Sequence, residues 1–295
     1  MTTQQIVALA AVGATLSYCA YRIGAVGRRA VVSGYAPPRI LLLGDSITQQ
    51  SFSVGGWGMR LADHYQRRAD VINRGFSGYN TRWALRLLDG PQLRDVADRT
   101  VLVIIFFGAN DASLPEHNLR QFVPLDEFVA NTRTIVEHLR AHCPSAAIIL
   151  MAPPPVDHKK RLAFQRQRYP NSASGILERT NENTGVYAEA VADLAKELGL
   201  PCVQLWEAMQ AAAPNSWDSF LSDGLHLSAD GNEKVAELLL ATIAETYPKL
   251  AVKTDPTTGN VGNSATRCAG LTPNGPFHDQ IDTEDLAASF RSMST

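Results

Sequence analysis

The stretch ILLLGDSIT at residues 40–48 gives the strongest indication of the fold. Four apolar residues in a row are typical of a short buried strand, and the Gly-Asp-Ser that follows predicts a turn into a helix. Ser46 then has two interpretations. Serine is among the residues preferred as helix N-caps. A serine at the carboxyl end of a parallel strand, however, has its hydroxyl in the cleft where open α/β sheets bind ligands, as a nucleophile would.

Strand and helix patterns alternate along the chain beyond this stretch. Further strands are predicted at residues 71–72, 101–107, 147–151 and 202–205, and helices at residues 57–68, 81–96, 124–142, 178–198 and 230–247. Residues 101–107, VLVIIFF, are apolar on both faces, which suits the centre of a parallel sheet. Residues 156–177 are basic and predicted to be irregular. Five strands alternating with helices predict an α/β fold in which a parallel sheet lies between two helical layers.

The two ends of the chain differ in composition from the predicted α/β domain at residues 40–250. Residues 1–29 contain an uncharged, mostly apolar run at 6–21, and arginines follow this run. Residues 30–39 are predicted to be a linker because they contain Ala-Pro-Pro. Residues 251–295 are rich in polar residues and are predicted to form a flexible tail that adds nothing to the core.

The apolar run at residues 6–21 has three interpretations. It is slightly shorter than the ~20 residues that span a bilayer. The arginines after it favour a signal anchor with the α/β domain on the cytoplasmic side, while an organelle transit peptide and a merely apolar helix are the alternatives. We therefore expect an intracellular protein that is membrane-anchored through this run or targeted to an organelle.

Composition and missing motifs exclude several classes of function. The chain of 295 residues has a net charge of -2 and no basic block, so no nucleic-acid partner is expected. Its four cysteines form no C-x-x-C pair, which argues against a zinc site or a disulfide framework. H-E-x-x-H, P-loop and G-x-S-x-G patterns are absent, so metalloprotease, NTPase and ordinary α/β-hydrolase interpretations lack support. We expect neither a metal nor an organic cofactor.

Several polar segments follow the ends of predicted strands. Gly75 follows the second strand, Asn110 follows the third, and a segment with Asp223 and His226 precedes the last helix. Parallel strands end at the same edge of a sheet, so these segments are expected to meet near Ser46. Acyl transfer needs a nucleophile, a base, a group that orients the base, and donors for the oxyanion. The five residues together supply these parts.

In this interpretation Ser46 is the nucleophile, His226 the base and Asp223 the group that orients it. The oxyanion donors are the backbone N–H groups of Ser46 and Gly75 and the side-chain amide of Asn110. Each residue also has a structural alternative. Asp-Gly-x-His is often a turn with a local aspartate bond, Asn110 could form a cap or an Asx turn, and Gly75 could supply a positive φ.

The same positions resemble the four signature blocks of the SGNH (GDSL-type) hydrolases, namely GDS at 44–46, Gly75, GAND at 108–111 and DGLH at 223–226. Longer segments such as NRGFSGYNTRWA and LSDGLHLSADGNE are similar to the isoamyl acetate-hydrolysing esterase branch. The resemblance implies a three-layer α/β/α sandwich with a five-stranded parallel sheet, in the flavodoxin-like manner. It also implies Ser46, Asp223 and His226 as the catalytic residues, with Ser46, Gly75 and Asn110 forming the oxyanion hole.

The predicted function is the hydrolysis of small acyl esters, similar to isoamyl acetate, with a small-molecule ester as the partner. Alternatives on the same fold are hydrolysis of lipid or lysophospholipid esters, thioesters or acetylated sugars. An alternative of another class is a catalytically idle binding or anchoring protein. Trp57 and Phe107 are candidates for the wall of an acyl or alcohol pocket, although such aromatics are more often core. Residues 158–161, His-Lys-Lys-Arg, are predicted to be a solvated loop, with a membrane-surface patch as the alternative.

Overall fold

The computed structural model describes residues 36–252, except for 89, 96 and 171–175, together with residues 271, 281, 282, 284 and 285. The chain divides into two units, Met1–Ala36 with Gly275–Thr295, and Pro37–Asn274. All described strands and helices belong to the second unit. The apolar run at 6–21 lies outside the described residues, as does most of the tail. Among the described residues, none of the helices combines the length and apolar character that a membrane crossing needs.

Five parallel strands form one sheet in the order β2-β1-β3-β4-β5. They are β1 (Arg39–Gly44), β2 (Asp70–Gly75), β3 (Thr100–Phe106), β4 (Ala147–Met151) and β5 (Cys202–Val203). The predicted α/β class and the five-stranded parallel sheet are therefore confirmed. β5 is shorter than predicted because Gln204 is already the cap residue of a helix, α10 (Leu205–Ala212), which the periodicity did not predict.

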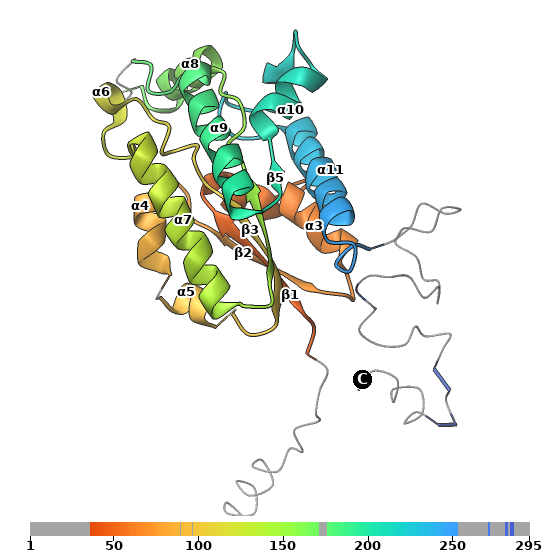
Figure 1. Cartoon of the computed structure of the whole chain (residues 1–295). Coiled ribbons are helices and arrows are strands. Elements are labelled where there is room, and N and C mark those ends of the chain that lie inside the picture. The colour runs from red at the N-terminus through yellow and green to blue at the C-terminus, as the bar shows by residue number, and fades with distance from the viewer. Residues whose placement is uncertain are drawn as a thin grey trace, which may run out of the picture. The chain divides into compact units, whose positions relative to one another are not determined.

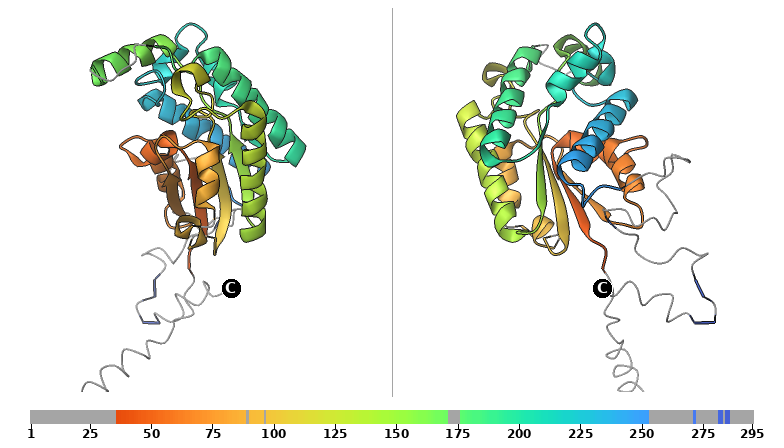
Figure 2. Two further views of the ribbon diagram at one scale, coloured as in Figure 1. Left: turned by 90° about the vertical axis from the view of Figure 1, so that its left-hand side faces the viewer. Right: turned by 45° about the vertical axis from the view of Figure 1, so that its right-hand side comes forward.

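Helices cover both faces of the sheet (Figure 1; Figure 2). On one face α3 (Trp57–His64), α10 and α11 (Ala229–Thr246) pack against alternate strand residues such as Leu42 and Ile104. On the other face α4 (Thr81–Ala84), α5 (Pro91–Arg94), α7 (Leu125–His142) and α9 (Asn181–Leu198) pack against the intervening residues such as Leu43 and Val103. Successive side chains of a strand point to opposite faces, so the two helical layers account for strands that are apolar throughout.

Two predictions about helices are wrong. The helix predicted at residues 81–96 is broken into α4, a 3-10 turn (Leu85–Leu87) and α5, and Gly90-Pro91 separates the last two. Proline at the first position of α5 has no N–H to give to a preceding turn. The segment predicted to be irregular at residues 156–177 contains α8 (His158–Arg168). The Asp157 side chain caps α8 by accepting from the backbone N–H groups of Lys159 and Lys160.

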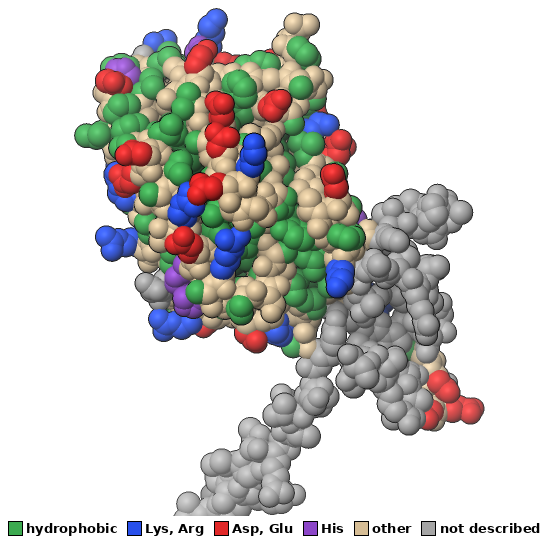
Figure 3. Space-filling view, viewed as in Figure 1, with side chains coloured by type: hydrophobic (Ala, Val, Ile, Leu, Met, Phe, Trp, Pro, Cys, Tyr) green, Lys and Arg blue, Asp and Glu red, His purple; other side chains and the backbone are tan. Residues whose placement is uncertain are grey.

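Caps define the other long helices. α9 begins after Thr180, whose side chain accepts from Asn183 N–H, and it ends at Gly199 with φ 65°. Glycine adopts this left-handed conformation without steric cost, which suits it to the end of a helix. α11 begins after Ser228, whose hydroxyl accepts from Gly231 N–H. Charges of both signs are interspersed over the face that α7 and α9 form (Figure 3).

The order of the strands in the sheet determines where a ligand-binding crevice can form. The chain leaves β1 towards β2 on one side and later adds β3 on the other side of β1. A crevice opens at the carboxyl ends of strands where the order reverses in this way. Gly44 of β1 lies opposite Gly75 of β2 and Phe106 of β3, so the segments after these three strands begin at the same level.

We expect Ile104→Ala to lower the free energy of unfolding by about 2–5 kcal/mol, because it removes buried methylenes and leaves a cavity. Ile104 is fully buried in the centre of β3. Val186→Ala is the matched control, since Val186 is 46% exposed on α9, and its effect should stay within about 0.5 kcal/mol. Urea unfolding measures both variants. Equal losses in the two would contradict the assigned core.

Candidate active site

Ser46 lies immediately after β1, as the first residue of the short helix α2 (Ser46–Gln49). The cap of α2 is Asp45, whose Oδ1 accepts from Ile47 N–H at 2.9 Å. The interpretation of Ser46 as the N-cap is therefore wrong by one residue. As the first residue of a helix, Ser46 has a backbone N–H without a partner inside the helix. Its side chain is left for another role.

His226 joins Ser46 to Asp223. Its Nε2 lies 3.0 Å from Ser46 Oγ, and its Nδ1 lies 2.8 Å from Asp223 Oδ2. Asp223 and His226 lie in the loop between the 3-10 helix Trp217–Phe220 and α11. With Nδ1–H donating to the carboxylate, the Nε2 lone pair faces the serine hydroxyl. This is the geometry that lets an imidazole take a proton from an alcohol.

The carboxylate of Asp223 serves two purposes at once. Its Oδ1 accepts from the backbone N–H groups of Leu225 and His226 at 3.0 and 2.7 Å, which closes the turn. Its Oδ2 faces the imidazole. The turn that formed the structural alternative is therefore present, and the same side chain still reaches His226. Burial works to raise the pKa of Asp223, but the hydrogen bond and charge of His226, its backbone N–H and Arg161 together hold that pKa well below its usual range.

Helix α8 holds the loop that carries Asp223 and His226 in place. The sequence interpretation did not predict this contact. Arg161 Nη1 donates to Asp223 Oδ2 at 2.6 Å, and Lys160 Nζ donates to Leu221 O at 2.6 Å. Asp157 N–H donates to Gly224 O at 3.0 Å. The prediction that residues 158–161 form a solvated loop is wrong, because they belong to helix α8 and two of their side chains bind the loop that carries Asp223 and His226. No local pattern signals this contact, since Arg161 and Asp223 are 62 residues apart.

Gly75 lies against the end of α2. A Cβ at Gly75 would come within 2.0 Å of Gln49 N, so only glycine fits here. Its φ is not positive, which excludes that explanation for the glycine. The backbone N–H of Gly75 donates to Asn73 Oδ1 at 2.8 Å, and Asn73 Nδ2 donates to Thr48 O at 2.8 Å. The Asn73 side chain thus links β2 to α2.

Asn110 lies in the turn after β3 and is 3% exposed. Its Nδ2 donates to Tyr79 O at 2.9 Å and makes a longer contact of 3.4 Å with Asp45 Oδ2. The amide nitrogen therefore points to the side of the site where Asp45 and Ser46 lie. One of its two hydrogens is held firmly by Tyr79, and the other is held only weakly.

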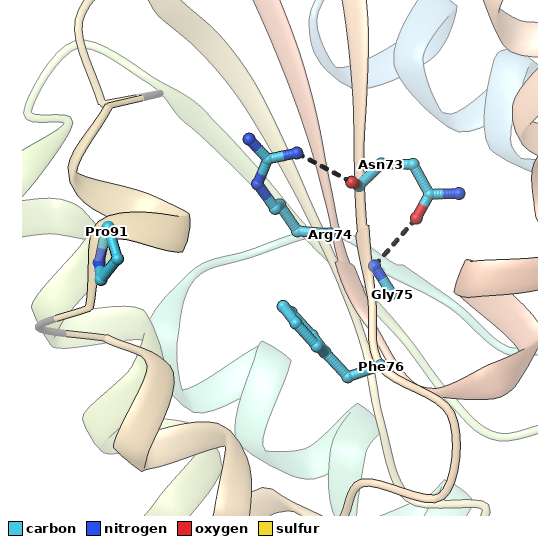
Figure 4. A pocket seen from close by; sticks show the side chains of 5 residues that line it. All are labelled: Asn73, Arg74, Gly75, Phe76 and Pro91. Carbon is cyan, nitrogen blue, oxygen red and sulfur yellow. Dashed lines mark hydrogen bonds between the residues drawn. The ribbon is translucent and has the colours of Figure 1, made fainter.

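A cavity of about 460 Å³ adjoins Gly75 and is lined by Asn73, Arg74, Gly75, Phe76 and Pro91. In Figure 4 the side chains of Arg74, in β2, and of Phe76, just after β2, extend towards the side of Pro91, whereas Asn73 extends to the opposite side of the strand. The cavity therefore combines an aromatic ring with a guanidinium next to a proposed oxyanion donor. Over the described part of the chain, no group of three or more His, Cys, Asp or Glu side chains could hold a metal ion.

Trp57 and Phe107, the candidates for a pocket wall, are 0% and 3% exposed. They belong to different core clusters, one on each face of the sheet. Trp57 Nε1 donates to Ile47 O at 3.2 Å and so supports α2 from below. Both residues pack as core aromatics, and the structure does not bring them together.

Asp45 adds a pH-dependent cost to the fold. Burial, the largest influence, raises the pKa of Asp45 from 3.8 to about 7, although the Ile47 N–H and the charges of His226 and Arg179 lower it. Between these two pH values the Asp45 carboxyl holds its proton in the folded protein and has lost it in the unfolded chain. The contribution of Asp45 to folding stability therefore falls as the pH rises through this window.

We expect Asp45→Asn to make the free energy of unfolding fall less steeply between about pH 4 and pH 7, because asparagine caps a helix equally well but cannot ionise. Asp193→Asn, an exposed position on α9, is the control and should leave the slope unchanged. Urea unfolding at several pH values measures the slopes. Parallel curves for wild type and Asp45→Asn would contradict the assigned burial cost.

Comparisons with known proteins show to which family the chain belongs. The model of the GDSL-like lipase/acylhydrolase family matches residues 42–234. A GDSL esterase/lipase of Arabidopsis thaliana is 48% identical over 212 residues, which cover 71% of this chain and 87% of the relative. An isoamyl acetate-hydrolysing esterase 1 homolog of Homo sapiens is 44% identical over 200 residues, which cover 66% of this chain and 77% of the relative.

Solved structures share the fold. A lipase/acylhydrolase from Enterococcus faecalis aligns with a TM-score of 0.54 at 27% identity, over 70% of this chain and 96% of its own. An acetylxylan esterase from Geobacillus stearothermophilus aligns with a TM-score of 0.54 at 22% identity, over 70% of this chain and 94% of its own. With a family match across most of the α/β domain and relatives close to half identical, the chain belongs to the GDSL-like lipase/acylhydrolase family and is a serine esterase.

Proposed function

We propose that this esterase hydrolyses carboxylic esters of small acyl groups through an acyl-enzyme on Ser46. The observation that carries the proposal is the position of His226, with Nε2 3.0 Å from Ser46 Oγ and Nδ1 2.8 Å from Asp223 Oδ2. A serine hydroxyl is a weak nucleophile unless a base removes its proton as it attacks. The loop that carries His226 supplies both that base and the carboxylate that holds it.

In the acylation step Ser46 Oγ attacks the ester carbonyl carbon while His226 Nε2 takes the hydroxyl proton. The C–O bond to the alcohol then breaks, and His226 returns the proton to the leaving alkoxide. Asp223 stabilises the imidazolium that exists between these events, without taking its proton. Because Asp223 has a depressed pKa, its carboxylate is charged throughout the neutral pH range.

The oxyanion of the tetrahedral intermediate is assigned to three donors, Ser46 N–H, Gly75 N–H and Asn110 Nδ2. Ser46 N–H is free of intrahelical bonds. Asn110 contributes the hydrogen whose contact with Asp45 is long. Gly75 contributes when its N–H shifts from Asn73 Oδ1, its partner in the free enzyme. Removing one donor of this kind usually costs about 3 kcal/mol of transition-state stabilisation.

Deacylation repeats the chemistry with water as the nucleophile. His226 takes a proton from the water as its oxygen attacks the acyl carbonyl, and then gives that proton to Ser46 Oγ as the acid leaves. The preference for small acyl groups, similar to isoamyl acetate, is supported by the isoamyl acetate-hydrolysing esterase 1 homologs, which are 44–47% identical to this chain. No bound metal takes part in these steps as assigned.

We expect Ser46→Ala to lower kcat for p-nitrophenyl acetate by at least ~10³-fold, because no other group can form the ester intermediate. Ser53→Ala is the matched control, since Ser53 is an exposed serine shortly after α2, and its kcat should equal that of wild type. Circular dichroism and thermal unfolding verify that both variants fold. Activity near wild type in folded Ser46→Ala would overturn the mechanism.

The substrate class is tested separately, with the wild-type enzyme and an acyl series from acetate to palmitate in ester and thioester form. The proposal expects kcat/KM to be highest for the shortest acyl esters. A maximum at long acyl chains would indicate a lipid hydrolase, and a preference for thioesters would indicate a thioesterase. Either result would replace the proposed substrate class while leaving the role of Ser46 intact.

A further inference from the structure

Arg179 is a buried guanidinium next to the site, and the reaction steps above do not use it. It precedes Thr180, the cap residue of α9, and is only 2% exposed. A charge is removed from water at a large cost unless it is paired and hydrogen-bonded. The contacts that Arg179 makes therefore indicate the role for which a charge is buried here.

The guanidinium donates to three segments of the site. Its Nε donates to Ala109 O at 3.1 Å, and its Nη2 donates to Asn110 Oδ1 at 3.2 Å and to Gln121 Oε1 at 2.6 Å. Its Nη1 forms an ion pair with the carboxylate of Glu178. Arg179 thus contacts both the backbone beside Asn110 and the side chain of Asn110.

We propose that Arg179 is a positioning residue for the amide of Asn110, fixing which way the amide points and strengthening the hydrogen-bond donor that faces the oxyanion. The inference rests on the proposed oxyanion role of Asn110. In this proposal Arg179 does not touch the substrate. Its buried charge orients the Asn110 amide and strengthens the amide as a hydrogen-bond donor.

The orientation of the Asn110 amide follows from its neighbours. On one side Oδ1 accepts from Arg179 Nη2 and from Gln121 Nε2, at 3.2 and 3.1 Å. On the other side Nδ2 donates to Tyr79 O and towards the carboxylate of Asp45. A flipped amide would place its NH₂ against two donors and its oxygen against two acceptors. Without Arg179, one of the two donors that oppose the flip is lost.

The charge of Arg179 also acts through the amide. A hydrogen bond from a guanidinium to a carbonyl oxygen is stronger than a neutral one, and hydrogen bonds in series polarise one another in a low dielectric. Electron density drawn towards Oδ1 makes the Nδ2–H hydrogens more positive. The interaction with a developing oxyanion is thereby strengthened at the moment when the charge appears.

Glu178 balances the charge of Arg179 and connects it to the base side of the site. The Glu178 carboxylate accepts from Gln165 and Asn118 as well as pairing with Arg179. Arg161 Nε lies 4.0 Å from Glu178 Oε1, and the same guanidinium pairs with Asp223. The oxyanion amide and the base-orienting carboxylate are therefore linked by one alternating series of charges.

The test is a double-mutant cycle between Arg179→Lys and Asn110→Ala, read as kcat and KM for p-nitrophenyl acetate. Lysine keeps a cation beside Glu178 but lacks the planar fork that reaches Ala109, Asn110 and Gln121 together. Gln121→Met is a second variant: it removes the other donor to Asn110 Oδ1 and also an acceptor of Arg179, while the guanidinium itself stays. Asn183→Ala is the control, because it deletes a partly buried hydrogen bond to Ala112 O, two residues beyond Asn110, without touching Asn110.

We expect Arg179→Lys to lower kcat by ~10-fold or more with KM changed by less than ~2-fold, and Gln121→Met to lower kcat by a smaller factor in the same way. Both effects should vanish when Asn110 is already alanine, since a residue that acts through Asn110 has nothing left to orient. Asn183→Ala should reduce stability while leaving kcat within about 2-fold of wild type.

Two results would overturn the inference. One is a kcat near wild type in folded Arg179→Lys and Gln121→Met. The other is the same loss of kcat in both backgrounds, which is the signature of general structural damage. If Arg179→Lys does not fold, the Gln121→Met pair alone decides between these outcomes. A wild-type kcat in Asn110→Ala would instead show that the proposed oxyanion role is wrong, so the two failures are distinguishable.

Discussion

The hydrogen bond between His226 Nε2 and Ser46 Oγ, 3.0 Å long, joins the first residue of α2 to the loop before α11, 180 residues away in the sequence. The sheet makes this contact possible. The turn after β1 lies at the carboxyl edge of the parallel sheet, and the loop before α11 reaches the same edge. Both partners are held from behind, Ser46 by a helix that Asp45 caps and His226 by a turn that Asp223 closes. Neither side chain depends on the substrate for its position.

Ionisable side chains buried near this contact lower the stability of the folded protein. Asp45, Asp111 and Arg179 are each at most 2% exposed, and burial raises the pKa of Asp45 to about 7 and that of Asp111 to about 6. Thr81 donates twice to Asp111 Oδ1, while Asp111 Oδ2 has no hydrogen-bond partner within the described residues. Such imperfectly satisfied groups are typical of functional sites that trade stability for a preorganised electrostatic environment.

Sequence patterns predicted the parts of the molecule that local chemistry determines. Apolar runs located the strands, and the positions after them indicated Ser46, Gly75 and Asn110, because parallel topology places strand ends together. The Asp223 loop was indicated by its place before the last helix and by the Asp-x-x-His spacing. Of the two interpretations of Ser46, the helix cap falls to the neighbouring Asp45 instead, since both residue types suit the position. The dipeptide Gly90-Pro91 indicates the break in the helix predicted at 81–96. The helical spacing of the apolar residues around it nevertheless favoured one continuous helix.

Contacts between distant polar residues could not be predicted from the sequence. The segment with Arg161 is strongly basic in the sequence, and this composition favours a solvated loop. In the structure α8 is held by one ion pair, from Arg161 to Asp223, and by a hydrogen bond from Lys160 to the backbone carbonyl of Leu221, 62 and 61 residues away. Arg179 likewise follows no motif, and its relation to Asn110 emerges only when α9 packs behind the turn after β3. Side-chain charge pairing of this kind has no periodic signature.

The central claim, that Ser46 Oγ carries the acyl group, is tested most directly by trapping the intermediate. The enzyme is mixed with p-nitrophenyl acetate, quenched in acid within the first turnover, digested, and examined by peptide mass spectrometry. The account predicts one added acetyl group on the peptide that contains Ser46, located by fragmentation at Ser46 itself. An acetyl group at another residue, or a burst of p-nitrophenol with no acetylated Ser46, would contradict it.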